Sequence, residues 1–217
     1  MNREYVANQR QFKRISTSTI SDVLDGFGIE GMLTGFHSIT PGVKVVGRAV
    51  TVTESSLGLG KHSLEEFRIG EVIDTAERGD IIVFNNEGRD VSTWGYLASL
   101  EATIKGIGGV VVHGGVRDVD DIRRLRFPVF AEHVVPTSGK GRIKIESINT
   151  PMEMKGVRVS PGDTIVADGT GIAVVPHDQI GRVLEEANRL EELEHLFVSR
   201  VRKGASLSEL SAKHRHL

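Results

Sequence analysis

Apolar runs rich in β-branched residues recur along the chain between glycine, proline and polar residues, which is typical of short buried strands. The clearest run is Val110-Val111-Val112, which leads to the glycine pair 114–115. Strands are expected at 43–54, 81–84, 110–116, 128–131, 143–148, 157–159, 164–167 and 172–175. Gly47 is expected to break the first strand or to form a bulge there. Segment 168–171 is predicted to be a hairpin turn and not a phosphate loop, because no helix follows it directly.

Segments with apolar residues at helical spacing alternate with these strands. Helices are expected at 16–28, 61–77, from Asp90 or Ser92 to 106, at 119–125 and at 178–203, and segment 31–42 is expected to be a loop. Asp178 is expected to cap the last helix, which stops at Gly204. This alternation predicts an α/β fold. Because the 217 residues contain no repeat and no long linker, we expect a single domain, with a polar extension at 1–14 and a polar tail at 205–217.

The composition limits the kinds of partner. Lysines and arginines number 27 and aspartates and glutamates 29, giving a net charge of -2, so no positive field attracts nucleic acid. The chain has no cysteine, which excludes a disulfide scaffold, a thiolate metal site and a cysteine nucleophile. Residues 1–14 lack the apolar core of a secretory signal, and no apolar run reaches membrane-spanning length. We therefore expect a cytoplasmic protein that binds neither nucleic acid nor a membrane.

Charged residues follow directly on the predicted strand at 110–116, where Arg117 and Asp118 precede Asp120 and Asp121. In open α/β sheets, ligands bind beyond the carboxyl ends of the strands. At such a place Arg117 can grip a carboxylate with two parallel hydrogen bonds, and Asp118 can hold a hard cation. A purely structural interpretation is also open, in which Asp118 caps the helix that follows and Arg117 pairs with Asp120 or Asp121.

Gly95 is expected in the first turn of the helix that ends at 106, where glycine costs about 1 kcal/mol relative to alanine. A glycine is explained there if another group must approach the backbone closely. The free N–H groups of a first helical turn, together with the helix dipole, form an anion site. The alternative is that Gly95 only makes room for Trp94 or for a neighbouring strand.

Glu194 interrupts the apolar stripe of the last predicted helix, one heptad from both Ala187 and Val201. A carboxylate beside a packed face needs a partner. Glu194 is expected either to pair with a neighbouring arginine or to point into a site, including a site on another subunit.

The pair Trp94-Gly95, followed after 21 residues by Arg117-Asp118-Val119-Asp120-Asp121, resembles the signature of the RraA-like family. This family includes class II 4-hydroxy-4-methyl-2-oxoglutarate aldolases and the regulators of ribonuclease activity A. The resemblance extends over most of the chain, through segments 16–24, 47–52, 79–80, 108–118 and 161–176. It implies a layered β/β/α domain of the swivelling type within the α/β class, assembled as homotrimers or homohexamers, with sites between subunits and a divalent cation, Mg²⁺ or Mn²⁺.

For an aldolase, the resemblance implies a role for each site residue. Asp118 binds the metal directly, with waters completing its coordination. Arg117 binds the ketone or enolate oxygen of the substrate and a carboxylate. The pyruvoyl carboxylate is held by backbone N–H groups of four consecutive residues: Gly95, Tyr96, Leu97 and Ala98.

Two further carboxylates are candidates near the metal, Asp121 and Glu194, the latter from an adjacent subunit. One residue departs from the family pattern, because the aldolases commonly have an acidic residue after the glycine, whereas this chain has Tyr96. A phenol can donate a hydrogen bond but is a poor base at neutral pH. We therefore expect a different acceptor substrate or weak turnover.

The implied function is metal-dependent cleavage of a 4-hydroxy-2-oxo acid to pyruvate, with oxaloacetate decarboxylation through the same pyruvate enolate. No lysine is placed for a Schiff base, so a metal-free route lacks support. The alternative within the family is a protein that inhibits a ribonuclease through protein contacts. A methyltransferase is discounted, because the chain shows no S-adenosylmethionine-type glycine loop followed by an acidic strand end.

Overall fold

The structure is a computed structural model and describes residues 3–211, so residues 1–2 of the expected extension and 212–217 of the expected tail lie outside the described residues. Helices are α1 Arg3–Phe12, α2 Thr17–Gly26, α3 Ile69–Thr75, α4 Tyr96–Lys105, α5 Val119–Leu125, α6 Ile180–Arg202 and α7 Leu207–Ser211, with 3-10 turns at Leu64–Glu66 and His177–Gln179. Strands are β1 Met32–Leu33, β2 His37–Ser38, β3 Val45–Ser56, β4 Ile81–Trp94, β5 Gly109–Val116, β6 Val129–Val134, β7 Ile143–Ile148, β8 Met152–Met154, β9 Val157–Val159, β10 Thr164–Ala167 and β11 Ile172–Val175. The alternation of strands and helices confirms the α/β class.

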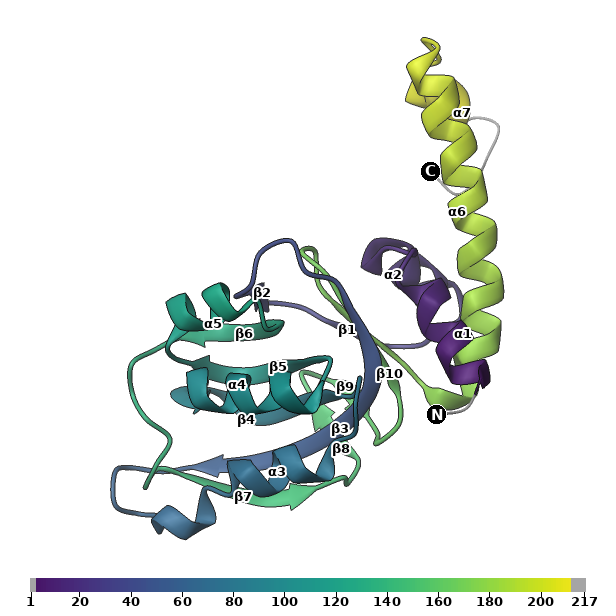
Figure 1. The fold of residues 1–217 in the computed structure, drawn as a ribbon. Coiled ribbons are helices and arrows are strands. Elements are labelled where there is room, and N and C mark those ends of the chain that lie inside the picture. The colour runs from purple at the N-terminus through teal and green to yellow at the C-terminus, as the bar shows by residue number, and fades with distance from the viewer. Residues whose placement is uncertain (1–2, 212–217) are drawn as a thin grey trace.

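One sheet organises the molecule, with strand order β1-β11-β10-β3-β4-β5-β6-β2 (Figure 1). The four strands β3, β4, β5 and β6 are parallel, so their carboxyl ends meet at one edge. β3 links two parts of the sheet, because its first half pairs with β10 and its second half pairs with β7, both antiparallel. The predicted hairpin is present as β10 and β11, and β8 pairs with β9 separately.

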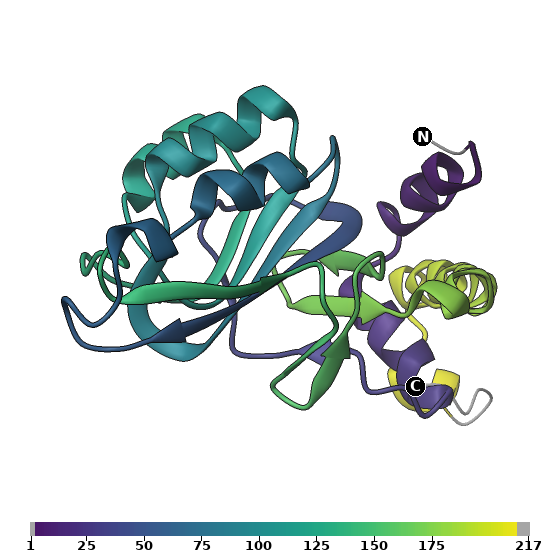
Figure 2. The same cartoon turned by 90° about the horizontal axis from the view of Figure 1, so that it is seen from below.

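Apolar side chains on the two faces of the parallel strands form two separate cores. On one face Val52 and Val112 pack with Val72 of α3, Ala102 of α4 and Ile122 of α5. The other face packs against the β8–β9 and β10–β11 hairpins through a second cluster that includes Val83, Val111, Met154, Val159, Ile165 and Ile172. Helices, parallel strands and hairpins are therefore stacked as α, β and β layers (Figure 2), which confirms the layered architecture.

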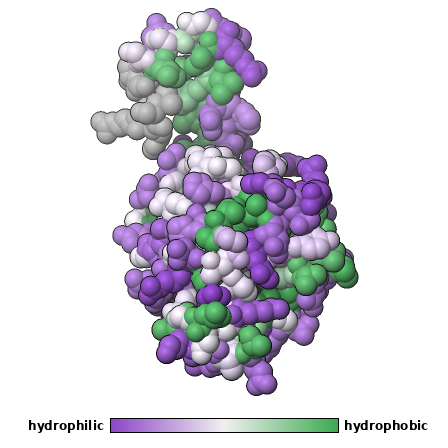
Figure 3. Space-filling model, turned by 90° about the vertical axis from the view of Figure 1, so that its left-hand side faces the viewer, coloured by the Kyte–Doolittle hydropathy of each residue, from purple (hydrophilic) through white to green (hydrophobic). Residues whose placement is uncertain are grey.

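The remaining helices form a third cluster beside the hairpin. Phe12 of α1, Ile20 of α2 and Val183 of α6 pack on Val166 and Val175 of the β10–β11 hairpin. The C-terminal half of α6 projects from the body of the molecule together with α7 (Figure 1), and Figure 3 shows apolar surface on this projecting part. No helix described within residues 3–211 has the length and apolar composition that crossing a membrane requires.

The single helix predicted at 61–77 is wrong. The chain forms a 3-10 turn at Leu64–Glu66 and only then α3 at Ile69–Thr75. Glu66 closes the first turn locally, because its Oε2 accepts a hydrogen bond from the Ser63 N–H at 2.7 Å. Leu64 is 71% exposed, so it does not share a buried face with Val72 and Ile73. The ragged apolar spacing of this segment reflects two elements and not one.

The strand predicted at 81–84 is longer than expected, because β4 continues to Trp94. Left-handed backbone at Glu87 and Gly88 kinks the strand, and its pairing with β5 resumes beyond the kink. The helix therefore begins at Tyr96 and not at Asp90 or Ser92. The apparent helical spacing of Trp94 and Leu97 misled the prediction, since Trp94 is buried in the strand and Leu97 is 77% exposed on the helix.

Three smaller expectations also fail. Gly47 lies within regular pairing to β10, and the bulge in β3 falls instead between Thr53 and Glu54. A side chain at Gly47 would stand 2.2 Å from the Gly79 carbonyl oxygen, so close packing explains this glycine. Asp178 lies in a 3-10 turn, and α6 starts after Gln179 without a side-chain cap. The expected loop at 31–42 contains the two short strands β1 and β2, which pair at opposite ends of the sheet.

Candidate active site

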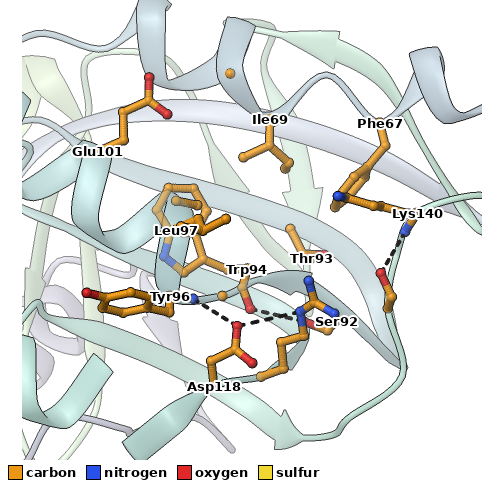
Figure 4. Close-up of a pocket in the computed structure, with 15 residues that line it drawn as sticks. Phe67, Ile69, Ser92, Thr93, Trp94, Tyr96, Leu97, Glu101, Asp118 and Lys140 are labelled. Atoms are coloured by element: carbon orange, nitrogen blue, oxygen red, sulfur yellow. Dashed lines mark hydrogen bonds and ion pairs between the residues drawn. The ribbon is translucent and has the colours of Figure 1, made fainter. Parts of the chain in front are cut away.

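A cavity of about 300 Å³ opens where β4 passes into α4 and β5 passes into α5 (Figure 4). The structure brings together in this cavity the predicted residues Gly95, Tyr96, Leu97, Ala98, Arg117 and Asp118. Further lining residues include Phe67, Ile69, Thr93, Glu101, Ser138 and Lys140. The cavity lies beyond the carboxyl ends of two neighbouring parallel strands, which is the usual location of ligands in open α/β sheets.

Trp94 fixes the position at which α4 begins. Its fully buried indole packs between Phe84 and Phe127, at ring-centroid distances of 5.7 and 6.3 Å. The indole Nε1–H donates to Ser99 Oγ at 2.8 Å, and the Trp94 carbonyl oxygen accepts from the Arg117 N–H at 3.0 Å. Burial of a large aromatic ring with its polar group satisfied stabilises this junction. The first turn of α4 is therefore held against the residue that follows β5.

Asp118 occupies the N-cap position of α5, as predicted, but its side chain does not cap that helix. Its backbone is left-handed, with φ 57° and ψ 35°, a conformation that costs energy for most residues other than glycine but is better tolerated by aspartate. Asp118 Oδ2 accepts a hydrogen bond from the Tyr96 N–H at 3.1 Å and lies 3.7 Å from Arg117 Nε. Within residues 3–211 no hydrogen bond reaches Oδ1. The carboxylate thus presents one oxygen to the cavity.

The alternative pairing of Arg117 with Asp120 or Asp121 is wrong. Asp120 pairs with Arg123 at 3.1 Å, and Asp121 pairs with Arg124, both one turn along α5. Arg117 instead lies beside Asp118, with its side chain 38% exposed, and lines the cavity. Its guanidinium is therefore accessible to a bound anion.

Gly95 stands immediately before α4, at the N-cap, and its conformation is extended. A Cβ atom at this position would lie 2.7 Å from Asp118 Oδ2 and 3.2 Å from Arg117 Cγ. The close approach that was expected at this glycine is thus made by the Arg117 and Asp118 side chains. Tyr96 N–H already has Asp118 as its acceptor, whereas the N–H groups of Leu97 and Ala98 lie in the first turn, where no acceptor exists within the helix.

The side chain of Tyr96 does not take the place of an acidic residue. Figure 4 shows its ring pointing away from Asp118 and Thr93. Only its backbone N–H takes part in the Asp118 contact. The absence of a carboxylate at this position is therefore not compensated by the phenol.

A buried carboxyl behind the cavity escaped the sequence analysis. Glu54 of β3 is 3% exposed, and its Oε2 lies at a hydrogen-bond distance of 2.6 Å from Oγ1 of the cavity residue Thr93. Its Oε1 is buried without a hydrogen-bond partner. Burial raises the pKa of Glu54 to about 8, against the smaller opposing effect of the Thr93 hydrogen bond. The available signal was its place after Val50 and Val52, at alternate positions that face the helix-side core.

The two remaining metal candidates, Asp121 and Glu194, do not line this cavity. Asp121 is engaged with Arg124 on α5. Glu194 is exposed on α6 and borders a groove of about 880 Å³ between α2 and α6. Figure 1 shows α6 on the opposite side of the chain from α4 and α5. No arginine pairs with Glu194 within residues 3–211, and no three His, Asp or Glu side chains in that range gather into a metal site.

Residues 17–174 match the sequence profile of a family described as RraA-like (aldolase/RraA), and the chain belongs to this family. Protein DlpA of Legionella pneumophila is 32% identical over 204 residues, which cover 92% of this chain and 32% of that protein, so the chain spans about a third of that relative. A protein of Halalkalibacterium halodurans named putative 4-hydroxy-4-methyl-2-oxoglutarate aldolase is 31% identical over 181 residues, covering 82% of this chain and 81% of that protein.

Two crystal structures share the fold. An uncharacterized protein from Pseudomonas syringae pv. tomato superimposes with a TM-score of 0.84 and 29% identity, covering 94% of this chain and 96% of that chain. Streptomyces coelicolor RraAS2, named an unusual member of the RNase ES inhibitor RraA protein family, gives a TM-score of 0.76 and 25% identity, covering 88% and 94% of the two chains. The family thus contains proteins named for two different functions.

Proposed function

We propose that the chain is a divalent-metal-dependent lyase that cleaves a 4-hydroxy-2-oxo acid of the 4-hydroxy-4-methyl-2-oxoglutarate type to pyruvate and also decarboxylates oxaloacetate. The observation that carries the proposal is the placement of Arg117, Asp118 and the first turn of α4 around one cavity. These groups offer a guanidinium, an open carboxylate oxygen and free backbone N–H groups, which together suit a small 2-oxo acid.

In this proposal the protein binds both oxygen-bearing groups of the pyruvoyl unit, the carboxylate and the 2-oxo oxygen. The N–H groups of Leu97 and Ala98, at the positive end of the α4 dipole, bind the carboxylate. The Arg117 guanidinium binds the 2-oxo oxygen, where negative charge develops as the C–C bond breaks. Because Arg117 Nε lies only 3.7 Å from Asp118, its side chain is oriented before substrate arrives.

The open oxygen of Asp118 suits a hard cation. Mg²⁺ is commonly bound by one or two carboxylates and several waters, so a site with a single carboxylate from this chain fits that chemistry. When bound, Mg²⁺ or Mn²⁺ would supply Lewis-acid polarisation of the 2-oxo group. Asp118 would hold the cation through Oδ1, while its Oδ2 keeps the hydrogen bond to the Tyr96 N–H.

The resemblance also supports an assembly in which a second copy completes the site. Glu194 is exposed on a projecting helix far from its own cavity, which suits a contribution to the site of an adjacent subunit in a trimer or hexamer. The exposed apolar residues Leu196, Val198 and Val201 on the same helix suit burial against another copy.

The direct test is pyruvate release from 4-hydroxy-4-methyl-2-oxoglutarate and from oxaloacetate, measured with Mg²⁺ or Mn²⁺ before and after EDTA. We expect pyruvate from at least one substrate, loss of activity with EDTA and recovery on adding the metal. Arg117→Ala should abolish turnover, whereas Arg123→Ala, which removes an ion pair with Asp120 outside the cavity, should not. Absence of metal-dependent pyruvate from these and related oxo acids would refute the lyase.

The second candidate function is inhibition of a ribonuclease through protein contacts. It is favoured by the name of the Streptomyces coelicolor relative, which shares 25% identity and the fold. This function predicts co-purification with a ribonuclease and an inhibition that Arg117→Ala leaves intact, since the cavity would take no part in it.

A further inference from the structure

We propose that Glu54 is a positioning residue that decides whether the Thr93 hydroxyl donates or accepts a hydrogen bond in the cavity. In the resting enzyme it leaves the Thr93 proton free to be donated to an anionic oxygen of the ligand. This inference rests on the proposed function in one respect, because it takes the ligand to be a small carboxylate. Glu54 itself does not line the cavity and acts only through Thr93.

The geometry forms a short chain from the interior of the protein to the cavity. Thr93 lines the cavity and is 3% exposed. Its Oγ1 lies 2.6 Å from Glu54 Oε2 and 3.5 Å from Asn86 Nδ2. Asn86 is held in turn by Ser56, whose hydroxyl bonds its Oδ1. The two contacts of Thr93 are buried and therefore shielded from competing water, and the Ser56 contact is partly buried.

Neutral Glu54 has only one good place for its proton. Oε1 is buried without any partner, so a proton there would be an unsatisfied donor, which costs free energy. On Oε2 the proton is donated to Thr93 Oγ1. The Thr93 oxygen then accepts from both Glu54 and Asn86, which uses its two lone pairs. Its own proton is left for a ligand in the cavity.

Ionised Glu54 reverses this arrangement. The carboxylate then accepts a hydrogen bond from the Thr93 hydroxyl, and Thr93 has only a lone pair to turn toward a bound anion. Burial holds the pKa of Glu54 near 8, so the donor arrangement predominates at neutral pH.

Within residues 3–211 no charged side chain forms an ion pair with Glu54, and this includes the cavity residue Lys140. Ile145 of β7 is the register partner of Glu54, and its neighbours on that strand pair together. The pairs on adjoining elements are Lys144 with Glu146, Arg68 with Glu71, His62 with Glu66, and Arg89 with Glu87. The protonation of Glu54 thus responds to burial and to Thr93, and not to a fixed countercharge.

Oxalate binding in the presence of Mg²⁺, measured by calorimetry at about pH 6.5 and about pH 9, tests the inference on either side of a pKa of about 8. Oxalate is fully ionised throughout this range, so only the protein changes its charge. For the wild type we expect up to about tenfold weaker binding at the higher pH, the effect of losing one hydrogen bond to a charged ligand. Glu54→Gln keeps a donor toward Thr93, and its affinity should stay near the low-pH wild-type value at both pH values.

Variants of Thr93 give an independent readout if Glu54→Gln does not fold. Thr93→Val should bind oxalate weakly and without this pH dependence, whereas Thr93→Ser should keep the dependence. Thr51→Val is the matched control, because Thr51 is buried on the same strand as Glu54 and bonds the Thr150 carbonyl outside the cavity. It should behave as the wild type.

The outcomes separate the two proposals. Equal pH dependence in the wild type, Glu54→Gln and Thr93→Val would overturn the role of Glu54 while leaving the lyase intact. No oxalate binding by the wild type at either pH would overturn the proposed function and this inference with it.

Discussion

The Tyr96 N–H donates a hydrogen bond of 3.1 Å to Asp118 Oδ2, and this contact joins the beginnings of two helices that follow neighbouring parallel strands. One carboxylate oxygen is thereby used to hold α4 in place, and the other remains open to the cavity. The contact depends on Gly95, because a side chain there would occupy the same space as the carboxylate.

Gly95→Ala should therefore reduce turnover more than stability. The added methyl group would lie 2.7 Å from Asp118 Oδ2 and would push Asp118 and Arg117 away from the helix start. We expect pyruvate formation to fall at least about tenfold, since small displacements of positioning groups have large effects on rate. Gly70→Ala is the matched control, because Gly70 lines the same cavity and a Cβ atom added there would meet nothing within 4 Å. Equal activity of the two variants would show that the close approach is irrelevant.

Asp118→Asn should separate the two tasks of this side chain. The amide oxygen can still accept from the Tyr96 N–H, but the negative charge that a hard cation requires is lost. We expect about 100-fold or greater loss of metal-dependent turnover and weaker Mn²⁺ binding by electron paramagnetic resonance, with a nearly unchanged melting temperature. Asp121→Asn, which alters a surface ion pair with Arg124, should remain close to the wild type in all three measurements.

The sequence predicts best where a local pattern has one physical explanation. The β-branched run before Gly114 forms a buried strand as expected, and the Gly-rich turn at 168–171 connects two strands as expected. Prediction from the sequence fails where tertiary packing decides which element a residue joins. Trp94 fits a helical stripe as well as a strand, and only its burial between Phe84 and Phe127 settles the matter.

Some residues of the candidate site could likewise be identified from the sequence, and others could not. Arg117 and Asp118 were identifiable, because charges that directly follow a buried strand stand out locally. The contact between Asp118 and Tyr96 was not, since these residues lie 22 positions apart and meet only through the alignment of β4 and β5. Glu54 was hard to identify for another reason: its alternation with Val50 and Val52 is a weak sign of burial, and nothing in the local sequence shows that Thr93 lies beside it.

Glu54 should make stability depend on pH. The unfolded chain releases this proton near its ordinary pKa of 4.5, whereas the folded chain keeps it up to about 8. The folded state therefore binds the extra proton between these values, and this contribution is fully present below the lower value and lost as pH rises to the upper one. Wild-type unfolding free energy should fall by on the order of a few kcal/mol across this window from Glu54 alone.

Urea unfolding of the wild type and Glu54→Gln at a series of pH values measures this contribution. The variant should show a flatter dependence between about pH 5 and about pH 8, whatever its absolute stability. Glu101→Gln removes an exposed carboxylate at the cavity and should leave the slope as in the wild type. Parallel slopes for all three proteins would mean that Glu54 is ionised in the folded state.

Glu194 should contribute to the cavity of an adjacent subunit and not to the cavity of its own chain. It lies on α6, on the far side of the molecule from Asp118, so its carboxylate can approach such a site only from a second copy. We expect Asp118→Asn and Glu194→Gln to be weakly active alone but to recover activity when the two proteins are unfolded together and refolded as mixed oligomers. If each site takes Asp118 from one subunit and Glu194 from the next, random mixing restores about a quarter of the sites. Glu192→Gln, on the same helix, serves as the control and should be active without mixing. Recovery no greater than the sum of the separate activities would show that Glu194 does not complete the site of a neighbouring subunit.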